Sequence, residues 1–202
     1  MSMRPNHVIG TADFIALPRV FIDLETTGDS LAEGGEVCEA GLVKVDPVSG
    51  DALAELNLMF GVANPFGRSE EELSYHRYNG FTFAEWVDAI LAEQALDQLN
   101  AFCAGCVPWA YNVSFEFRWL ADYFYRYGRD WQGDYHWHCL MTKASEALRP
   151  DFLAGRITKL SLSSVGAYLG LGEEAKPHRG LTGARYEVQI DARLNTRRQS
   201  AR

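Results

Sequence analysis

The amino-acid sequence predicts one α/β domain whose core is a five-stranded mixed sheet. Three strand-like segments come first, and alternating helical and strand-like segments follow, an order typical of such a domain. The length of 202 residues fits a single compact domain and leaves little room for a second. Hydrophobic residues form 47% of the chain, which is ample for a sizeable core.

The first three strands are predicted to form an antiparallel meander. Residues 19–24 are a short apolar run of alternating character that ends in acidic residues, which indicates a central strand. Residues 36–45 and 53–60 flank the turn-forming sequence Asp46-Pro47-Val48-Ser49-Gly50-Asp51, so we expect a hairpin there. Two further strands are predicted at residues 107–111 and 135–140.

Apolar residues at helical spacing predict the helices. We expect a long helix at residues 83–102 and an aromatic helix at residues 113–127 that ends at Gly128. A helix at residues 161–169 has Ser161 as its N-cap and Gly170 at its end. Further helices are predicted at residues 70–75, 142–148 and 181–194, before a disordered basic tail at residues 196–202.

Composition narrows the cellular setting. The longest apolar stretches fall far short of the roughly 20 residues that cross a bilayer, and residues 1–15 lack the apolar core of a signal peptide. We therefore expect a cytoplasmic protein with reduced thiols rather than disulfides. Cys103 and Cys106 form a C-x-x-C pair, but no second close pair completes a zinc site, which favours two half-buried thiols in a turn.

The net charge of −8 argues against a protein that coats duplex nucleic acid, because such proteins carry strongly basic surfaces. An enzyme that holds metal ions carries clustered carboxylates instead, and the bound cations reverse the local sign of the field. The acidic composition is therefore compatible with a metal-dependent nuclease.

The strongest local signal is the segment Phe21-Ile22-Asp23-Leu24-Glu25-Thr26-Thr27-Gly28. Asp23 and Glu25 are two residues apart on a predicted strand, so their side chains share a face. Adjacent carboxylates repel unless a proton or cation offsets their charge, and a hard divalent ion does so with oxygen ligands. The alternative is two solvated acids that lead into a turn.

This segment resembles the first motif of the DEDD 3′–5′ exonucleases, the superfamily of proofreading exonuclease subunits and oligoribonuclease. The second motif resembles Asn112-Val113-Ser114-Phe115-Glu116, where Glu116 stands in place of the family's Asp. The third motif of the histidine-type (DEDDh) branch resembles Pro177-His178-Arg179-Gly180-Leu181-Thr182-Gly183, where Gly183 stands in place of the metal-binding Asp. The resemblance covers about residues 18–195, the expected core of a single domain 1–202.

The resemblance implies a ribonuclease-H-like three-layer fold and a 3′–5′ exonuclease that uses Mg²⁺ or Mn²⁺. Such an enzyme releases nucleoside 5′-monophosphates from single-stranded or frayed 3′ ends of RNA or DNA. Asp23, Glu25 and Glu116 would hold two metal ions, and His178 would act as general base. The implied substrate contacts are Thr26, Thr27, Gly28, Asn112 and Phe115. Relatives are often dimers, and exposed aromatic residues at 123–127 could form a homodimer interface.

Two departures from the family pattern bear on activity. Glu116 keeps the charge and adds one methylene, which a ligand acting through water can tolerate. Gly183 removes a carboxylate, which should weaken the second metal. Glu187 lies four residues on, on the same helical face, and is the candidate substitute ligand, although it is about 5.4 Å further along the helix. Gly183 favours the alternative function, a weakened or inactive exonuclease-like domain that binds nucleic-acid ends or a protein partner.

Overall fold

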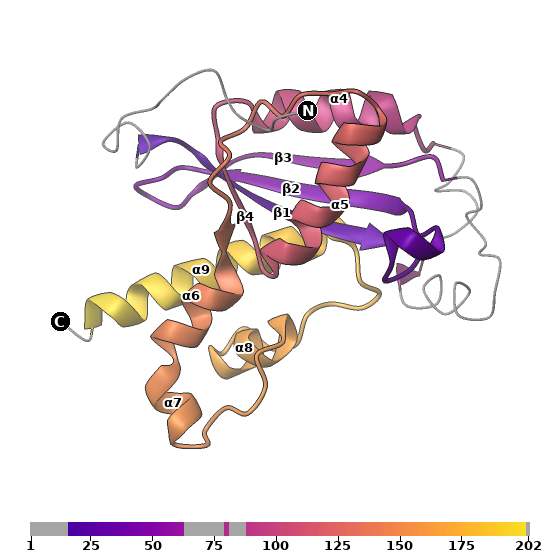
Figure 1. Cartoon of the computed structure of the whole chain (residues 1–202). Helices are drawn as coiled ribbons and strands as arrows, with labels where there is room; N and C mark the ends of the chain where they lie inside the picture. Colours follow the sequence, from indigo (N-terminus) through magenta and orange to yellow (C-terminus); the bar gives the residue numbers. More distant parts are fainter. Residues whose placement is uncertain (1–15, 63–78, 81–87, 201–202) are drawn as a thin grey trace.

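The computed structural model describes residues 16–62, 79–80 and 88–200, which form three layers around a five-stranded sheet. Figure 1 shows α4 and α5 on one face of this sheet and α9, with α6, α7 and α8 beside it, on the other. The strands are β1 (Arg19–Thr26), β2 (Val37–Val45), β3 (Ala52–Met59), β4 (Val107–Ala110) and β5 (His138–Cys139). The helices are η1 (Leu31–Glu33), α4 (Ala92–Cys103), α5 (Val113–Arg126), α6 (Leu140–Ala147), α7 (Arg149–Leu153), α8 (Leu162–Tyr168) and α9 (Gly180–Ser200).

The strand order β3-β2-β1-β4-β5 confirms the predicted mixed sheet. β1, β2 and β3 pair antiparallel as a meander, with Asp23 opposite Gly41. β4 and β5 join in parallel, β4 directly against β1. Because β1 and β4 are parallel neighbours, their carboxyl ends lie at the same edge of the sheet.

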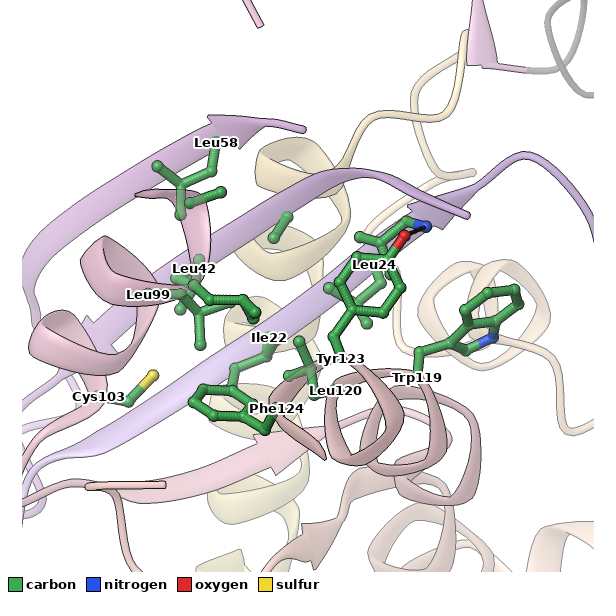
Figure 2. Close-up of a cluster of buried hydrophobic side chains, with 14 of the residues drawn as sticks. Ile22, Leu24, Leu42, Leu58, Leu99, Cys103, Trp119, Leu120, Tyr123 and Phe124 are labelled. Atoms are coloured by element: carbon green, nitrogen blue, oxygen red, sulfur yellow. Dashed lines mark hydrogen bonds between the residues drawn. The ribbon is translucent and has the colours of Figure 1, made fainter. Parts of the chain in front are cut away.

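Alternation along β1 divides its side chains between two cores. Val20, Ile22 and Leu24 belong to the core that α4 and α5 cover, and Figure 2 shows Ile22 and Leu24 among residues of these helices and of β2 and β3. Phe21 belongs to the opposite core, which α6, α8 and α9 cover. The same alternation directs the side chains of Asp23 and Glu25 towards the face of the sheet on which α9 lies.

α9 approaches the sheet so closely that glycine is required at the contact. A Cβ atom on Gly41 of β2 would lie 1.9 Å from the carbonyl carbon of Gly180 and 2.0 Å from the backbone nitrogen of Leu181. A Cβ atom on Gly180 would lie 2.6 Å from the backbone nitrogen of Gly41. Backbone atoms cannot move aside independently, so these two glycines determine the distance between the start of α9 and the sheet.

Glu39 of β2 anchors the same end of α9. Its fully buried carboxylate accepts hydrogen bonds from the backbone N–H of Gly180 at 3.1 Å and from Arg179 Nε at 3.0 Å. Its other oxygen accepts a hydrogen bond from Asn57 Nδ2 at 2.8 Å. A buried carboxylate is tolerated only with such partners, and a negative charge also interacts favourably with a helix N-terminus.

Several predicted boundaries are confirmed. α5 ends one residue earlier than expected, and α8 has Ser161 as its N-cap, whose hydroxyl accepts a hydrogen bond from the backbone N–H of Ser164. Gly128 and Gly170 follow these helices with positive φ angles of 61° and 80°, a conformation that glycine adopts at no steric cost.

The predicted helix at residues 83–102 is wrong at its start, because within the described part it begins at Ala92. Ile90 instead forms a parallel bridge with Phe60: its N–H donates to Met59 and its carbonyl accepts from Gly61. The predicted helix at residues 70–75 lies outside the described residues.

Two predictions near the C-terminal half are also corrected. The predicted strand at 135–140 is reduced to His138–Cys139, because Asp134 Oδ1 accepts from the backbone N–H of His136 and holds that segment in a turn. The predicted disordered tail is helical as far as Ser200. Arg197 pairs with Asp151 at 2.8 Å, which helps to hold this part of α9 against α7.

Two expectations about exposure are corrected as well. Tyr123 and Phe124 are buried, and the hydroxyl of Tyr123 accepts a hydrogen bond from the Val37 N–H. Of the aromatic residues expected to form an interface at 123–127, Tyr125 is the strongly exposed one, at 71%. Cys103 and Cys106 are free thiols and fully buried rather than half-buried. None of the described helices is long and apolar enough to span a membrane.

The glycine contact generates a stability prediction. Gly41→Ala should lower the free energy of unfolding by about 3 kcal/mol or more, because the added methyl meets backbone rather than a movable side chain. Gly28→Ala is the control, since its Cβ atom would have its nearest neighbour at 3.9 Å, and we expect a change within about 0.5 kcal/mol. Urea unfolding measures both. Equal stability of the two variants would contradict the tight contact.

Candidate active site

A cavity of about 480 Å³ brings together segments that are far apart in the sequence. It lies at the carboxyl ends of the parallel strands β1 and β4, between the start of α5, the start of α8 and the loop before α9. Its lining residues are Asp23, Leu24, Glu25, Tyr111, Asn112, Phe115, Glu116, Ser161, Leu162, Ser163, Glu174, Lys176 and His178. The cavity therefore unites residues of all three sequence motifs.

Asp23 and Glu25 lie side by side at the end of β1, as the alternation of the strand predicts. Both keep partial exposure through the cavity, but the protein that surrounds them is dense enough to exclude much of the solvent. Burial raises the pKa of Asp23 well above its ordinary value. Burial, followed by the charge of Glu39, raises the pKa of Glu25 to about 8.

Glu116 lies in the first turn of α5 and faces the same cavity. Its side chain is buried, and its Oε2 atom has no hydrogen-bond partner among the described residues. Burial raises the pKa of Glu116 to about 8. The negative charge of Glu116 in turn raises the pKa values of Asp23 and Glu187, so these three carboxylates form one electrostatic group.

Glu187 of α9 joins this group from the opposite side. It is fully buried; Oε1 accepts a hydrogen bond from the Tyr111 N–H at 2.9 Å, and Oε2 has no partner in the described part of the chain. Burial and then the charge of Glu116 raise its pKa well above the ordinary value. The Cα–Cβ bond of a helical residue tilts towards the N-terminus of the helix, so Glu187 reaches back towards the turn that contains Gly183.

Gly183 lies directly against Asp23. A Cβ atom at position 183 would be 2.2 Å from Asp23 Oδ2 and 2.7 Å from Asp23 Cγ. No side chain fits there unless Asp23 moves. Asp191, one turn beyond Glu187, points elsewhere and pairs with Arg19 and Lys143. Glu187 is therefore the acid of α9 that shares the electrostatic group of Asp23.

The threonines at the end of β1, Thr26 and Thr27, make local hydrogen bonds instead of lining the cavity. Thr26 donates its hydroxyl to the Gly28 carbonyl at 2.8 Å, and Thr27 accepts from the Glu36 N–H at 2.9 Å. Neither threonine nor Gly28 is a lining residue. Asn112 and Phe115 do line it, and Asn112 Oδ1 accepts a hydrogen bond from the Ser114 hydroxyl.

His178 lies in the cavity with an acid that sequence reasoning missed. Its Nδ1 atom is 3.1 Å from Oε1 of Glu174, in the loop that precedes α9. Lys176 and Ser163 also line the cavity and were not predicted as site residues. Their only sequence signal is proximity to His178 or to the Ser161 cap. Lys176 lies in a segment without a periodic pattern, and the short helix that contains Ser163 does not reveal which of its faces meets the cavity.

The donor atoms suit a hard divalent cation, although a coordination shell is not already assembled. Across residues 16–62, 79–80 and 88–200, no three His, Cys, Asp or Glu side chains converge in the arrangement of a metal site. The carboxylates of Asp23, Glu25, Glu116 and Glu187 nevertheless share one region, and two of their buried oxygens lack hydrogen-bond partners. Carboxylates with raised pKa values are the ligands whose mutual repulsion a divalent ion relieves.

Comparisons of fold identify exonuclease I among similar solved structures, although no family model matches the sequence and no curated protein matches it. A product-bound exonuclease I has a TM-score of 0.73 and 16% identity over 91% of this chain and 44% of that one. E. coli exonuclease I bound to a dT13 oligonucleotide has a TM-score of 0.73 and 17% identity over 92% of this chain and 42% of that one. A zinc-bound complex of the E. coli enzyme with single-stranded DNA has a TM-score of 0.73 and 18% identity, with the same coverage.

The fold is ribonuclease-H-like. The five-stranded mixed sheet with helices on both faces matches these structures over nearly the whole chain. At 16–18% identity the likeness concerns the fold, and the chain spans less than half the length of these exonuclease I chains. The activity of this chain therefore depends on its own residues and not on that likeness.

The raised pKa values predict how stability depends on pH without metal. The carboxyl of Glu116 titrates near 4.5 when unfolded and near 8 when folded. Protonation of this carboxyl stabilises the folded protein fully below about pH 4.5, and the stabilisation is lost as the pH rises towards 8. The loss is at most about 1.4 kcal/mol for each unit by which folding raises the pKa. Glu116→Gln should therefore exceed the unaltered protein in stability at pH 8 and roughly equal it at pH 5.

Thermal unfolding in EDTA at several pH values measures this difference. The control is Glu55→Gln, because Glu55 pairs with Arg185 at the surface and its pKa is lowered. In that variant, stability should change with pH between pH 5 and pH 8 just as it does in the unaltered protein. If Glu116→Gln shows the same change with pH too, the buried carboxyl is ionised throughout and the electrostatic description is wrong.

Proposed function

We propose that this chain is a metal-dependent 3′–5′ exonuclease that releases nucleoside 5′-monophosphates from single-stranded or frayed 3′ ends. The observation that carries the proposal is the group of carboxylates from β1, α5 and α9 beside one open cavity that also contains a histidine. Gathering like charges in a region of low solvent access is costly. A purely structural domain gains nothing from that arrangement.

Asp23, Glu25, Glu116 and Glu187 would hold two Mg²⁺ or Mn²⁺ ions. When bound, such ions stabilise the attacking water and the leaving 3′ oxygen of a scissile phosphate. His178 would take the proton of the attacking water, since histidine is the side chain that most often serves as a general base. Glu25 is the carboxylate that we assign both to metal binding and to the reacting centre.

The cavity also offers groups for the substrate. Phe115 can stack on a base without regard to its identity, and Asn112 offers an amide beside it. Contacts from Thr26, Thr27 and Gly28 to the substrate terminus stay a prediction. The hydroxyls of the two threonines already form hydrogen bonds with the local backbone. The exonuclease I structures include complexes with single-stranded DNA, which makes single-stranded DNA the first substrate to test and RNA the second.

The alternative function is a weakened or inactive exonuclease-like domain that binds nucleic-acid ends or a protein partner. Gly183 and the lack of an assembled coordination shell in the described part favour it. Glu187 favours the enzyme, because it returns a fourth carboxylate to the group. A homodimer that uses the exposed Tyr125 stays a prediction.

The nuclease proposal predicts metal-dependent shortening of 5′-labelled single-stranded DNA or RNA from the 3′ end. Asp23→Ala should reduce the rate by at least about a thousand-fold, since it removes the carboxylate that interacts electrostatically with Glu25, Glu116 and Glu187. Asp51→Ala, an exposed acid in the β2–β3 turn, should leave the rate unchanged. Binding of the oligonucleotide without any shortening, in both Mg²⁺ and Mn²⁺, would support the binding alternative instead.

The close contact at Gly183 predicts that Glu187 is the acid of α9 that binds metal. Glu187→Gln should weaken Mn²⁺ binding, measured by calorimetry, and reduce nuclease activity by about a hundred-fold or more. Gly183→Asp should impair both properties as well, because its Cβ atom would displace Asp23. Tighter Mn²⁺ binding or higher activity in Gly183→Asp would mean that the Asp23 side chain can move aside. It would also mean that the unaltered chain lacks a fourth metal ligand at position 183.

A further inference from the structure

His178 and Glu174 lie close together inside the cavity. The Nδ1 atom of His178 is 3.1 Å from Oε1 of Glu174. Both residues line the cavity, and only 14% of the His178 side chain and 7% of the Glu174 side chain are exposed. The pair therefore lies inside the cavity and not on the outer surface of the protein.

Glu174 is also held from a second direction. The hydroxyl of Ser163, at the start of α8, donates a long hydrogen bond of 3.4 Å to Oε2 of Glu174. The two oxygens of the carboxylate thus face partners from two different segments. Contacts on both sides limit the rotamers that the carboxylate can adopt, which in turn limits the orientation of the imidazole.

The position of Glu174 has an electrostatic cost. Its negative charge raises the pKa values of Asp23, Glu25 and Glu187, so it adds to the repulsion within the carboxylate group. A neutral side chain of the same size would avoid that repulsion. A carboxylate at this position therefore needs a role that depends on its charge or on its ability to accept a hydrogen bond.

Histidine chemistry supplies such a role. A neutral imidazole carries its proton on one nitrogen and a lone pair on the other. An ionised carboxylate only accepts hydrogen bonds, so the nitrogen beside it carries the proton. With Nδ1 protonated against Glu174, Nε2 keeps the lone pair that can take a proton from water. The oxygen of that water then attacks the phosphorus, and the bond to the 3′ oxygen breaks.

We propose that Glu174 is a positioning residue that holds His178 in the Nδ1–H tautomer and stabilises the imidazolium formed when Nε2 takes the proton of the attacking water. The effect on rate rests on the proposed nuclease function, whereas the tautomer can be measured without any activity. The other charged groups that share the cavity with His178 are Asp23, Glu25, Glu116 and Lys176.

Three variants separate the hydrogen bond from the charge. Glu174→Met removes the acceptor and keeps a similar length, and Glu174→Gln removes the charge and keeps an acceptor. Glu173→Met is the matched control, because Glu173 is the exposed neighbouring acid. Thermal unfolding verifies that each variant folds, and the tautomer of the unaltered protein tests the proposal even if the Met variant does not fold.

Long-range ¹H–¹⁵N correlation spectra of the whole protein report the tautomer of each of its five histidines, with His178 assigned by its loss in His178→Gln. We expect the Nδ1–H form in the unaltered protein and in Glu173→Met, and the Nε2–H form in Glu174→Met. The Nε2–H form in the unaltered protein, or the Nδ1–H form in a folded Glu174→Met, overturns the proposal.

Kinetics on a 5′-labelled single-stranded oligonucleotide test the consequence. Glu174→Met should lower kcat by about ten- to a hundred-fold, the scale of a small misplacement of a reacting group, with KM and Mn²⁺ affinity unchanged. Glu174→Gln should lower kcat by a smaller factor. Weaker Mn²⁺ binding in these variants would make Glu174 a metal ligand and overturn the proposal. If the unaltered protein degrades nothing, the nuclease function fails, and the tautomer still decides the role of Glu174.

Discussion

The backbone contact between the start of α9 and strands β1 and β2 is the constraint on which the candidate site depends. Gly41 and Gly180 allow the helix to lie directly on the sheet, and the buried carboxylate of Glu39 holds that end in place. This closeness leaves no space for a side chain at Gly183, above Asp23. A carboxylate from α9 can therefore approach Asp23 only from the next turn of the helix, where Glu187 lies.

The same packing determines the electrostatics of the site. Helices on both faces reduce solvent access at the end of β1, so carboxylates that would be ordinary acids at a surface acquire raised pKa values. Two of their oxygens, on Glu116 and Glu187, are buried without hydrogen-bond partners among the described residues. Protons and divalent cations both relieve such a group, and the competition between them links the stability of the fold to pH and to metal.

Local patterns predicted the parts of the fold that depend on neighbouring residues. Alternating apolar residues identified the β1–β2–β3 meander, and the Ser161 cap identified the start of α8. The errors arose where distant contacts decide the outcome. Ile90 fits a helical pattern, but its backbone pairs beside Phe60. The basic end of the chain reads as a disordered tail, but Arg197 pairs with Asp151 and α9 continues.

The sequence by itself determined that Asp23 and Glu25 share one face of a strand, because side chains alternate with a period of two in any β-strand. It also indicated, through the order of three motifs, that Glu116 and His178 lie near them. Only the tertiary structure decided that Glu187 joins these acids and that Glu174 contacts His178. Those relations depend on the height of α9 above the sheet and on the path of the preceding loop, which no local pattern of residues encodes.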